Sequence, residues 1–404
     1  MKIFINILIA VLFMGTAHAW AADIIWYINA SGQSVSTGTY SCPELSTVQP
    51  YSNLNLDGNG DFIPLVEEYF SLAGYGNCET PDSGLANTLT LLSGRVVAIT
   101  HHGVPGYAIA QLNQGTTPYN NSLTAVSQAW ANAASEGRGI RMVGTLWTQG
   151  ESDYTMTSDE YEAELIQLQE DYQADIQAIT GVTGTLPLIT SQCGKWSAGY
   201  SGVAVAQFRA SVDYPGRVIC ALPLYLTDHS ADWGHLTNTG SRRLGEYYGK
   251  VINEMIENGG TWRPLSPISI RRSGTMITIK CHVPVPPIVV DTATLGAVDN
   301  YGFTVIKDSD ETEVSINSVS VSGSDTIIIN LVSDPGEKIR VTYALEGYGV
   351  IETHRYSWGN IRDSDTTTGI ADDGPLYNWL VLFDESEGYG DGTVIHGSCR
   401  MSFR

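Results

Sequence analysis

Between residues 24 and 257, short apolar segments alternate with longer segments whose apolar residues recur every three or four positions. The short segments predict buried strands and the longer ones predict helices. Because parallel strands need crossover connections, the alternation predicts a three-layer α/β fold, in which helices cover both faces of a parallel sheet. The predicted strands are residues 24–28, 96–100, 142–147, 186–190 and 217–222, and the predicted helices are residues 62–72, 84–92, 123–133, 157–176, 203–211 and 244–255.

The pattern changes after a proline-containing segment at residues 263–267. From residue 275 onward, short segments alternate polar and apolar residues without a helical period, so residues 264–355 are predicted to form a small β-sandwich. The segment 356–404 is rich in Gly and Asp, yet its apolar run at residues 376–383 predicts that it packs on the body of the protein. The α/β domain is assigned to residues 23–262.

The first residues of the chain include Lys2, an apolar run at residues 3–14, and the small-residue sequence Ala17-His18-Ala19. This pattern is typical of a secretory signal peptide, here residues 1–22, and the apolar run is too short to span a bilayer. We therefore expect a secreted or periplasmic protein that has no membrane contact once the signal peptide is removed.

Six cysteines agree with export, because disulfides persist in oxidising compartments. No cysteine or histidine spacing resembles a zinc site, and we expect neither a metal nor a cofactor. Six cysteines allow fifteen pairings, and order along the chain favours Cys42 with Cys78, Cys193 with Cys220, and Cys281 with Cys399.

The net charge of -22 argues against nucleic acid as a partner, because such partners select a basic surface. The same argument disfavours an anionic membrane surface. A neutral or weakly charged substrate is compatible with this charge, which by itself says nothing about the type of reaction.

Polar residues that could carry chemistry follow three of the predicted strands. Ser34 comes shortly after the first strand, and Gln149 follows the third. After the last strand, Asp232 and His235 are three residues apart, a spacing that lets the carboxylate accept a hydrogen bond from Nδ1 while Nε2 stays free. Asp228 with His229 is the alternative pair. The carboxyl ends of parallel strands meet at one sheet edge, so the serine and an Asp/His pair can form a serine triad there.

These motifs resemble the SGNH hydrolases, and in particular their sialate O-acetylesterase-like and acetylxylan-esterase-like branch. The resemblance covers roughly residues 24 to 257 and implies a flavodoxin-like parallel sheet. It is carried by Gly32-Gln33-Ser34, by Gly103-Val104-Pro105-Gly106-Tyr107-Ala108-Ile109, by Trp147-Thr148-Gln149-Gly150-Glu151-Ser152, and by Asp232 with His235-Leu236-Thr237.

The resemblance also implies roles for the residues. Ser34 would attack an ester carbonyl, His235 would take its proton, and Asp232 would hold the imidazole in the right tautomer. The oxyanion donors would be the backbone amides of Ser34 and Gly106 and the side-chain amide of Gln149.

Several neighbouring residues could bind substrate. Glu151 and Asp153 could bind a sugar hydroxyl or could instead brace the Gln149 loop. His101 and His102 could line the pocket or could make structural hydrogen bonds at a strand end. Tyr107 and Trp233 are further candidates for substrate contacts.

Together these features predict an exported serine esterase that removes O-acetyl groups from a carbohydrate, either a polysaccharide or a sialic-acid-type glycan. The acetyl specificity and the type of sugar come from the resemblance alone. One alternative is a lipase or thioesterase, which would have a wide apolar pocket. Another is a non-catalytic glycan-binding protein on a hydrolase scaffold, which would not require all four of Ser34, Gln149, Asp232 and His235.

Overall fold

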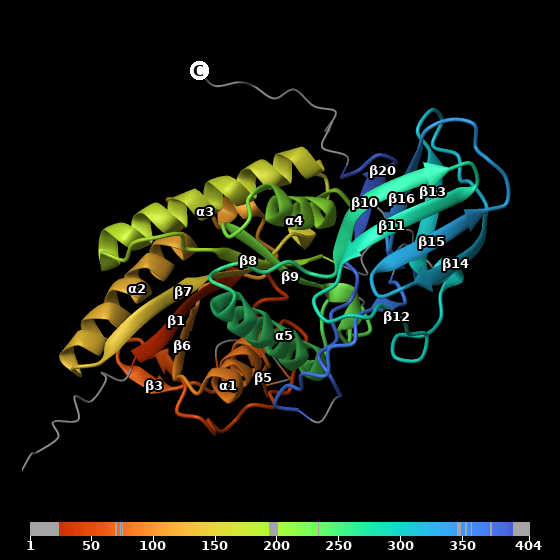
Figure 1. Ribbon diagram of the computed structural model, residues 1–404. Helices are drawn as coiled ribbons and strands as arrows, with labels where there is room; N and C mark the ends of the chain where they lie inside the picture. The colour runs from red at the N-terminus through yellow and green to blue at the C-terminus, as the bar shows by residue number, and fades with distance from the viewer. Residues whose placement is uncertain are drawn as a thin grey trace, which may run out of the picture.

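The computed structural model describes residues 24–390, except 69–70, 73, 75, 194–200, 233, 346–348, 352–353, 357 and 372–373 (Figure 1). The predicted signal peptide at residues 1–22 lies outside the described residues. No helix among the described residues is both long and apolar enough to cross a bilayer.

A seven-stranded sheet forms the centre of the α/β part, with the strand order β3-β2-β6-β1-β7-β8-β9. All its pairings are parallel except that of β2 with β3. The five predicted strands are confirmed, and β2 and β3 extend the sheet beyond them. The strands are β1 (Ile24–Gly32), β2 (Leu54–Leu56), β3 (Phe62–Pro64), β6 (Val97–His101), β7 (Gly139–Thr148), β8 (Leu188–Gln192) and β9 (Val218–Pro223).

Helices cover both faces of this sheet, which confirms the three-layer prediction (Figure 1). Alternate residues of β1 enter different cores: Ile25 and Tyr27 pack with α2, α3 and α4, whereas Trp26 and Ile28 pack with α1 and α5. The helices are α1 (Pro81–Ser93), α2 (Thr117–Ser135), α3 (Ser158–Thr180), α4 (Ser201–Asp213) and α5 (Asn238–Glu257).

The helix predicted at residues 62–72 is wrong. Phe62–Pro64 forms the edge strand β3, where the missing N–H of Pro64 is tolerated. Further along, the carboxylate of Glu67 turns inward and accepts hydrogen bonds from the amides of Thr80 (3.0 Å) and Ser83 (3.1 Å) at the start of α1. Burial, together with the neighbouring carboxyl groups of Glu79 and Asp82, outweighs these hydrogen bonds and raises the pKa of Glu67 to about 8.

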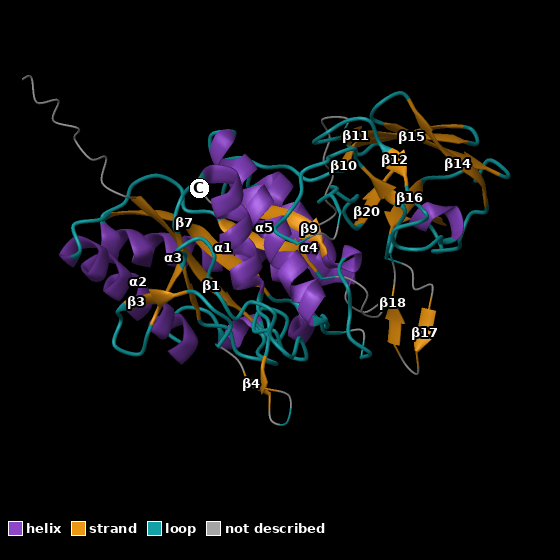
Figure 2. Ribbon diagram, turned by 90° about the horizontal axis from the view of Figure 1, so that it is seen from below, coloured by secondary structure: helices purple, strands orange, loops and turns teal. Residues whose placement is uncertain are grey.

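Antiparallel sheets follow the α/β part and lie to one side of it in Figure 2. In β11 and β15, inward apolar residues alternate with outward ones, as the sequence predicts. One sheet has the order β10-β11-β15-β14 and another the order β13-β16-β20. The strands are β10 (Ser266–Ser273), β11 (Met276–His282), β13 (Phe303–Lys307), β14 (Ile316–Ser322), β15 (Thr326–Leu331), β16 (Ile339–Tyr343) and β20 (Phe383–Ser386).

Short strand pairs complete the described structure. Strand β12 pairs with β19, and the hairpins β4–β5 and β17–β18 extend from the body (Figure 2). Their bounds are β4 (Ser71–Leu72), β5 (Gly76–Asn77), β12 (Val289–Val290), β17 (Gly349–Ile351), β18 (His354–Tyr356) and β19 (Ile361–Arg362).

The segment after residue 356 joins the two halves of the molecule. It contributes β19 and β20 to the β sheets and also contacts α5. There the fully buried ammonium of Lys250 donates to Asp365 (2.9 Å), to Asn378 (2.7 Å) and to the carbonyl of Leu376. The predicted boundaries near residues 262 and 356 stay predictions.

One predicted disulfide is present and one is wrong. Cys42 and Cys78 are bonded, with a Cα–Cα distance of 4.1 Å. Cys193 and Cys220 are free buried thiols, because the register of β8 and β9 pairs Cys220 with Thr190, so Cys193 lies about 10 Å further along the strand. Cys281 is likewise a free buried thiol, and its expected partner Cys399 lies outside the described residues.

Candidate active site

The carboxyl edge of the central sheet brings Ser34, Gln149 and His235 together from three different loops. The turn after β1 starts with Gly32, whose φ of 148° suits glycine and whose missing side chain leaves room for the carbonyl of Thr148. The amide of Gln33 donates to that carbonyl (3.0 Å), and the amide of Thr39 donates to the carbonyl of Ser34 (3.0 Å). These contacts fix the turn that presents Ser34.

A continuous chain of hydrogen bonds links Ser34, His235 and Asp232. The Ser34 hydroxyl lies 2.9 Å from Nε2 of His235, and Nδ1 of His235 lies 2.6 Å from Oδ2 of Asp232. When Nδ1 donates to the carboxylate, Nε2 accepts from the hydroxyl. His235 therefore lies within direct hydrogen-bonding distance of both Ser34 and Asp232.

The carboxylate of Asp232 is held by several donors. Its other oxygen, Oδ1, accepts hydrogen bonds from the Ser230 hydroxyl (2.6 Å) and from the amides of Gly234 (3.1 Å) and His235 (3.0 Å). Burial alone would raise the pKa of Asp232, but the hydrogen bonds from His235 and Ser230 outweigh it and hold this pKa well below its usual range. Asp232 is therefore ionised at neutral pH.

The Gln149 side chain makes three contacts with its surroundings. Its Nε2 donates to the carbonyl of Tyr107 (3.2 Å) and to Asp153, and its Oε1 accepts from the hydroxyl of Tyr161 (2.7 Å). Asp153 also accepts from the amide of Ile109 (2.9 Å). Asp153 thus braces the Gln149 loop, and both hydrogens of the Gln149 amide already have acceptors.

Two backbone amides near the serine have no such acceptors. Within the part of the chain that the structure describes, the amides of Ser34 and Gly106 donate no hydrogen bond. The loop that contains Gly106 is tied to the serine turn, because the amide of Val104 donates to the carbonyl of Gly32 (2.9 Å). The two amides can therefore serve as donors to a ligand.

His101 and His102 lie side by side in the chain but have different surroundings. Nδ1 of His101 lies 2.9 Å from Asp82, and its Nε2 lies 3.2 Å from the hydroxyl of Ser36, so its contacts here are structural. Burial, and secondarily the proximity of His101, lowers the pKa of His102 to about 4. His102 is therefore neutral at neutral pH.

The remaining candidates from the sequence are Glu151, Tyr107, Trp233 and Asp228. Glu151 is partly exposed, but its Oε2 is buried and has no partner among the described residues, and burial raises the pKa of its carboxyl group. Tyr107 is half-buried, and its carbonyl accepts from Gln149. Trp233 lies outside the described residues, and among the residues that are described no hydrogen bond joins Asp228 to a triad residue; its carbonyl accepts from the amide of Thr237 (3.0 Å).

Two residues of the site escape the sequence analysis. The side-chain oxygen of Gln33 accepts from the amides of Gly150 (3.2 Å) and Ser152 (3.0 Å), so it joins the serine turn to the Gln149 loop. The exposed ring of Tyr40 lies against the imidazole of His235, with 4.9 Å between ring centroids. The motif containing Gln33 is a sequence signal, but no pattern in the sequence indicates Tyr40.

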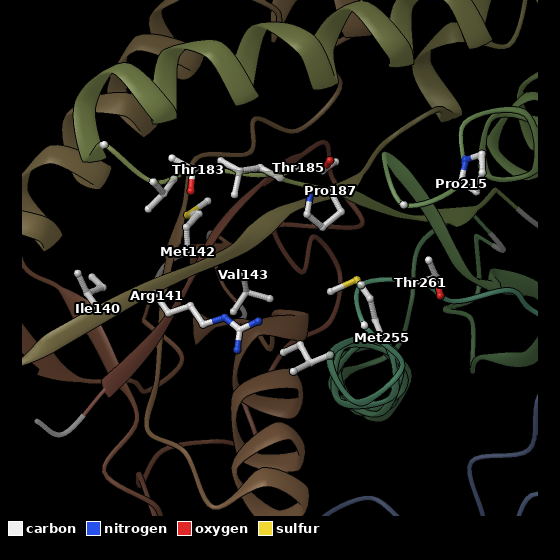
Figure 3. Close-up of a pocket in the computed structure, with 17 residues that line it drawn as sticks. Ile140, Arg141, Met142, Val143, Thr183, Thr185, Pro187, Pro215, Met255 and Thr261 are labelled. Carbon is white, nitrogen blue, oxygen red and sulfur yellow. The ribbon is translucent and has the colours of Figure 1, made fainter. Parts of the chain in front are cut away.

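A large cavity of about 880 Å³ lies at the opposite edge of the sheet (Figure 3). It is lined by Arg141, Met142 and Val143 near the start of β7 and by loops that precede β8 and β9. These are the amino ends of the strands, whereas Ser34 follows the carboxyl end of β1. This cavity is therefore separate from the candidate active site.

Comparison with known proteins identifies the family of the chain. A family model described as carbohydrate esterase, sialic acid-specific acetylesterase, matches residues 41–254, which is more than half of the chain. The match includes Gln149, Asp232 and His235, and Ser34 lies shortly before it. No curated protein sequence matches the chain.

The chain is similar to several solved structures, one of which supports the fold. XAC1771, a carbohydrate acetylesterase from Xanthomonas citri, is 16% identical and has a TM-score of 0.57, and the match covers 89% of this chain and 80% of that one. A protein from Arabidopsis thaliana is 18% identical with a TM-score of 0.46, over 58% of this chain and 98% of that one. NanS is 15% identical with a TM-score of 0.46, over 59% of this chain and 99% of that one.

The family match agrees with the fold and with the resemblance that the sequence motifs indicate. The central sheet is of the SGNH type, and the separate antiparallel sheets form a β-rich part beside it. The chain belongs to the carbohydrate esterase family of sialic acid-specific acetylesterases and is a carboxylic ester hydrolase.

Proposed function

We propose that this protein is a secreted serine esterase that removes O-acetyl groups from a carbohydrate through Ser34, His235 and Asp232. The single observation that carries the proposal is the 2.9 Å distance between the Ser34 hydroxyl and Nε2 of His235, with Asp232 on the other ring nitrogen. A hydroxyl, a base and an orienting carboxylate in this order activate a nucleophile for acyl transfer.

In the first step, Oγ of Ser34 attacks the carbonyl carbon of the acetyl group while Nε2 of His235 takes the hydroxyl proton. The imidazolium that forms is stabilised by the ionised Asp232. When the tetrahedral intermediate collapses, His235 returns the proton to the sugar oxygen, which leaves as an alcohol. The acetyl group is then bound to Ser34 as an ester.

The carbonyl oxygen becomes negatively charged in this step and needs donors. The backbone amides of Ser34 and Gly106 meet this need, since both lack acceptors within the described part of the chain. Gln149 is the third proposed donor. Its amide would have to exchange its hydrogen bond with the carbonyl of Tyr107 for one with the oxyanion, because both of its hydrogens are engaged.

In the second step, water replaces the sugar at the same site. His235 takes a proton from the water, the hydroxide attacks the acetyl carbon, and acetate leaves as Ser34 recovers its proton. Apart from this water, the scheme uses only side chains and backbone groups of the protein. Glu151 and His102, which each carry a buried polar atom without a partner among the described residues, are proposed to contact the sugar.

The substrate is proposed to be either an O-acetylated polysaccharide or an O-acetylated sialic acid. The family description favours the sialic acid. The similar solved structure XAC1771 is described only as a carbohydrate acetylesterase, so other O-acetylated sugars are also candidate substrates. Export of the protein is proposed from the sequence pattern of residues 1–22 and agrees with the Cys42–Cys78 disulfide.

Acetate release from a panel of O-acetylated glycans tests the proposal. The wild type should release acetate from at least one acetylated polysaccharide or sialoglycan, and Ser34→Ala should lower kcat by at least about 1,000-fold without changing the unfolding temperature. Ser135→Ala, which alters an exposed serine in α2, is the matched control and should retain full activity.

Three other outcomes would contradict the proposal. Equal turnover by Ser34→Ala would eliminate the proposed nucleophile. Preference for long-chain esters over acetyl esters would indicate a lipase or thioesterase. Glycan binding without acetate release would indicate a non-catalytic glycan-binding protein.

A further inference from the structure

Tyr40 combines two features that are unusual for a tyrosine. Its side chain is 53% exposed, and its φ of 67° lies in the left-handed region that favours glycine. Such backbone strain persists only where surrounding contacts enforce it, and it is concentrated at functional sites. A function for Tyr40 would explain both its exposed side chain and its strained backbone.

The surrounding contacts do hold Tyr40 in place. The amide of Ser41 donates to the carbonyl of Gly38 (2.8 Å), and the Ser41 hydroxyl donates to the carbonyl of Leu236 (2.9 Å). The next residue, Cys42, is fixed by its disulfide to Cys78. Because Leu236 directly follows His235, the bond from Ser41 couples the position of Tyr40 to that of the triad imidazole.

The ring of Tyr40 lies beside the triad imidazole itself. The centroids of the Tyr40 and His235 rings are 4.9 Å apart, and the ring planes are tilted by 59°. Nε2 of the same imidazole contacts the Ser34 hydroxyl. A group that packs on Tyr40 is therefore about one side chain away from the nucleophile.

The proposed reaction places the sugar in this region. His235 must return a proton to the sugar oxygen, so the sugar must lie against the imidazole when the acetyl group is on Ser34. Sugar rings present C–H groups on their faces, and an exposed aromatic ring offers an apolar plane that can cover such a face. Tyr40 is an exposed aromatic ring in contact with the imidazole.

We propose that Tyr40 is a carbohydrate-binding platform on which the ring of the acetylated sugar stacks. This inference rests on the proposed function, because it assumes that the ester cleaved at Ser34 is carried by a sugar. It adds a residue that determines substrate specificity and leaves the chemical roles of the triad unchanged. A tyrosine that served only to pack against His235 would not need to expose half of its surface.

Steady-state kinetics with two esters test the platform. One substrate is an acetylated oligosaccharide, and the other is ethyl acetate, which has no ring that could stack on Tyr40. Tyr40→Asn removes the ring while keeping a residue that tolerates a positive φ. It should raise KM for the oligosaccharide about tenfold and leave kcat/KM for ethyl acetate within a factor of two.

Two further variants complete this experiment. Tyr40→Phe keeps the aromatic plane and should stay within about threefold of the wild type on both substrates. Leu91→Ala, which truncates an exposed apolar side chain near the end of α1, is the control and should change neither substrate. An equal loss of kcat on both esters with Tyr40→Asn would show that Tyr40 only supports His235, and would overturn the inference. An unchanged KM for the oligosaccharide would also overturn it.

Binding measurements separate this inference from the proposed function. In the Ser34→Ala background, titration calorimetry with the acetylated oligosaccharide should show an affinity about tenfold lower after Tyr40→Asn. If Ser34→Ala still cleaves esters, the proposed nucleophile fails, whereas the platform is judged by this affinity alone. An affinity that is unchanged by Tyr40→Asn would refute the platform even if the triad is correct.

Discussion

Nδ1 of His101 lies 2.9 Å from Oδ2 of Asp82, and both side chains are almost completely buried. The other ring nitrogen of His101 contacts Ser36, two residues beyond Ser34. The serine turn is thus contacted by two Asp–His pairs, one partly exposed at Ser34 and one buried at Ser36. The buried pair supports the turn through Ser36, whose hydroxyl donates to the carbonyl of Gln33 (2.6 Å).

The buried pair should therefore matter for stability. His101→Gln leaves the buried Asp82 carboxylate without its imidazole partner, and removing the partner of a buried charged group costs about 3 kcal/mol of unfolding free energy. Urea unfolding measures this loss. His282→Gln, which alters a half-buried histidine in β11, is the control and should cost less than about 1 kcal/mol. Equal losses in the two variants would contradict a special role for His101.

Asp232→Asn tests the orienting carboxylate of the proposed triad. An amide in place of the carboxylate favours the tautomer of His235 whose Nε2 carries the proton, so Nε2 cannot accept from Ser34. We expect kcat for acetyl ester hydrolysis to fall by about 1,000-fold while KM stays within a factor of two. Ser230→Ala removes only a neutral donor to Asp232 and should cost less than about tenfold. A kcat within tenfold of the wild type for Asp232→Asn would argue against the triad.

Glu385 in β20 should make stability depend on pH. Burial raises the pKa of Glu385 to about 8; nearby Arg209 opposes this shift and Asp384 adds to it. A carboxyl group with a raised folded-state pKa stabilises the fold at low pH, and this contribution is lost as pH rises from about 4.5 to about 8. The Tm of Glu385→Gln minus the Tm of the wild type should therefore be roughly 2–4 °C larger at pH 8 than at pH 5. A difference in Tm that does not change with pH would show that Glu385 ionises normally.

The Cys42–Cys78 disulfide should stabilise both the fold and the site. It closes a loop of 36 residues, and the chain-entropy model gives about 4 kcal/mol for its loss in the Cys42→Ser/Cys78→Ser double variant. Because Tyr40 and Ser41 directly precede Cys42, KM for an acetylated glycan should also rise. Differential scanning calorimetry with and without a reductant provides the control, since only the wild type should lose stability when reductant is added. A reductant effect of equal size in both proteins would place the sensitive bond elsewhere.

The central fold is predictable from the sequence because its signals are local. Each of the five predicted strands is a short apolar run, and the start of α3 is marked by Thr157 and Glu160, which form a capping box. The edge strand Phe62–Pro64 is missed because its pairing with Leu54–Leu56 depends on tertiary contact, and three residues carry too little periodicity. The wrong prediction of a Cys193–Cys220 disulfide has the same origin, since the order of the cysteines along the chain does not reveal the register in which β8 and β9 pair.

The site shows the same division between local and long-range information. Ser34, Gln149, Asp232 and His235 stand in recognisable motifs at strand ends, so their types and order are readable from the chain. The contact of Tyr40 with His235, and that of His101 with Ser36, join segments far apart in sequence, and neither residue's neighbours form a pattern that predicts its partner. Only the folded sheet brings these side chains together.

The buried ammonium of Lys250 has a consequence for the order in which the chain can fold. All three of its acceptors, on Asp365, Leu376 and Asn378, are synthesised more than a hundred residues after it. Until they emerge from the ribosome, the Lys250 ammonium lacks these acceptors, and burying it without them is costly. We therefore expect the face of α5 around Lys250 to become fully buried only after residues 365–378 have been synthesised.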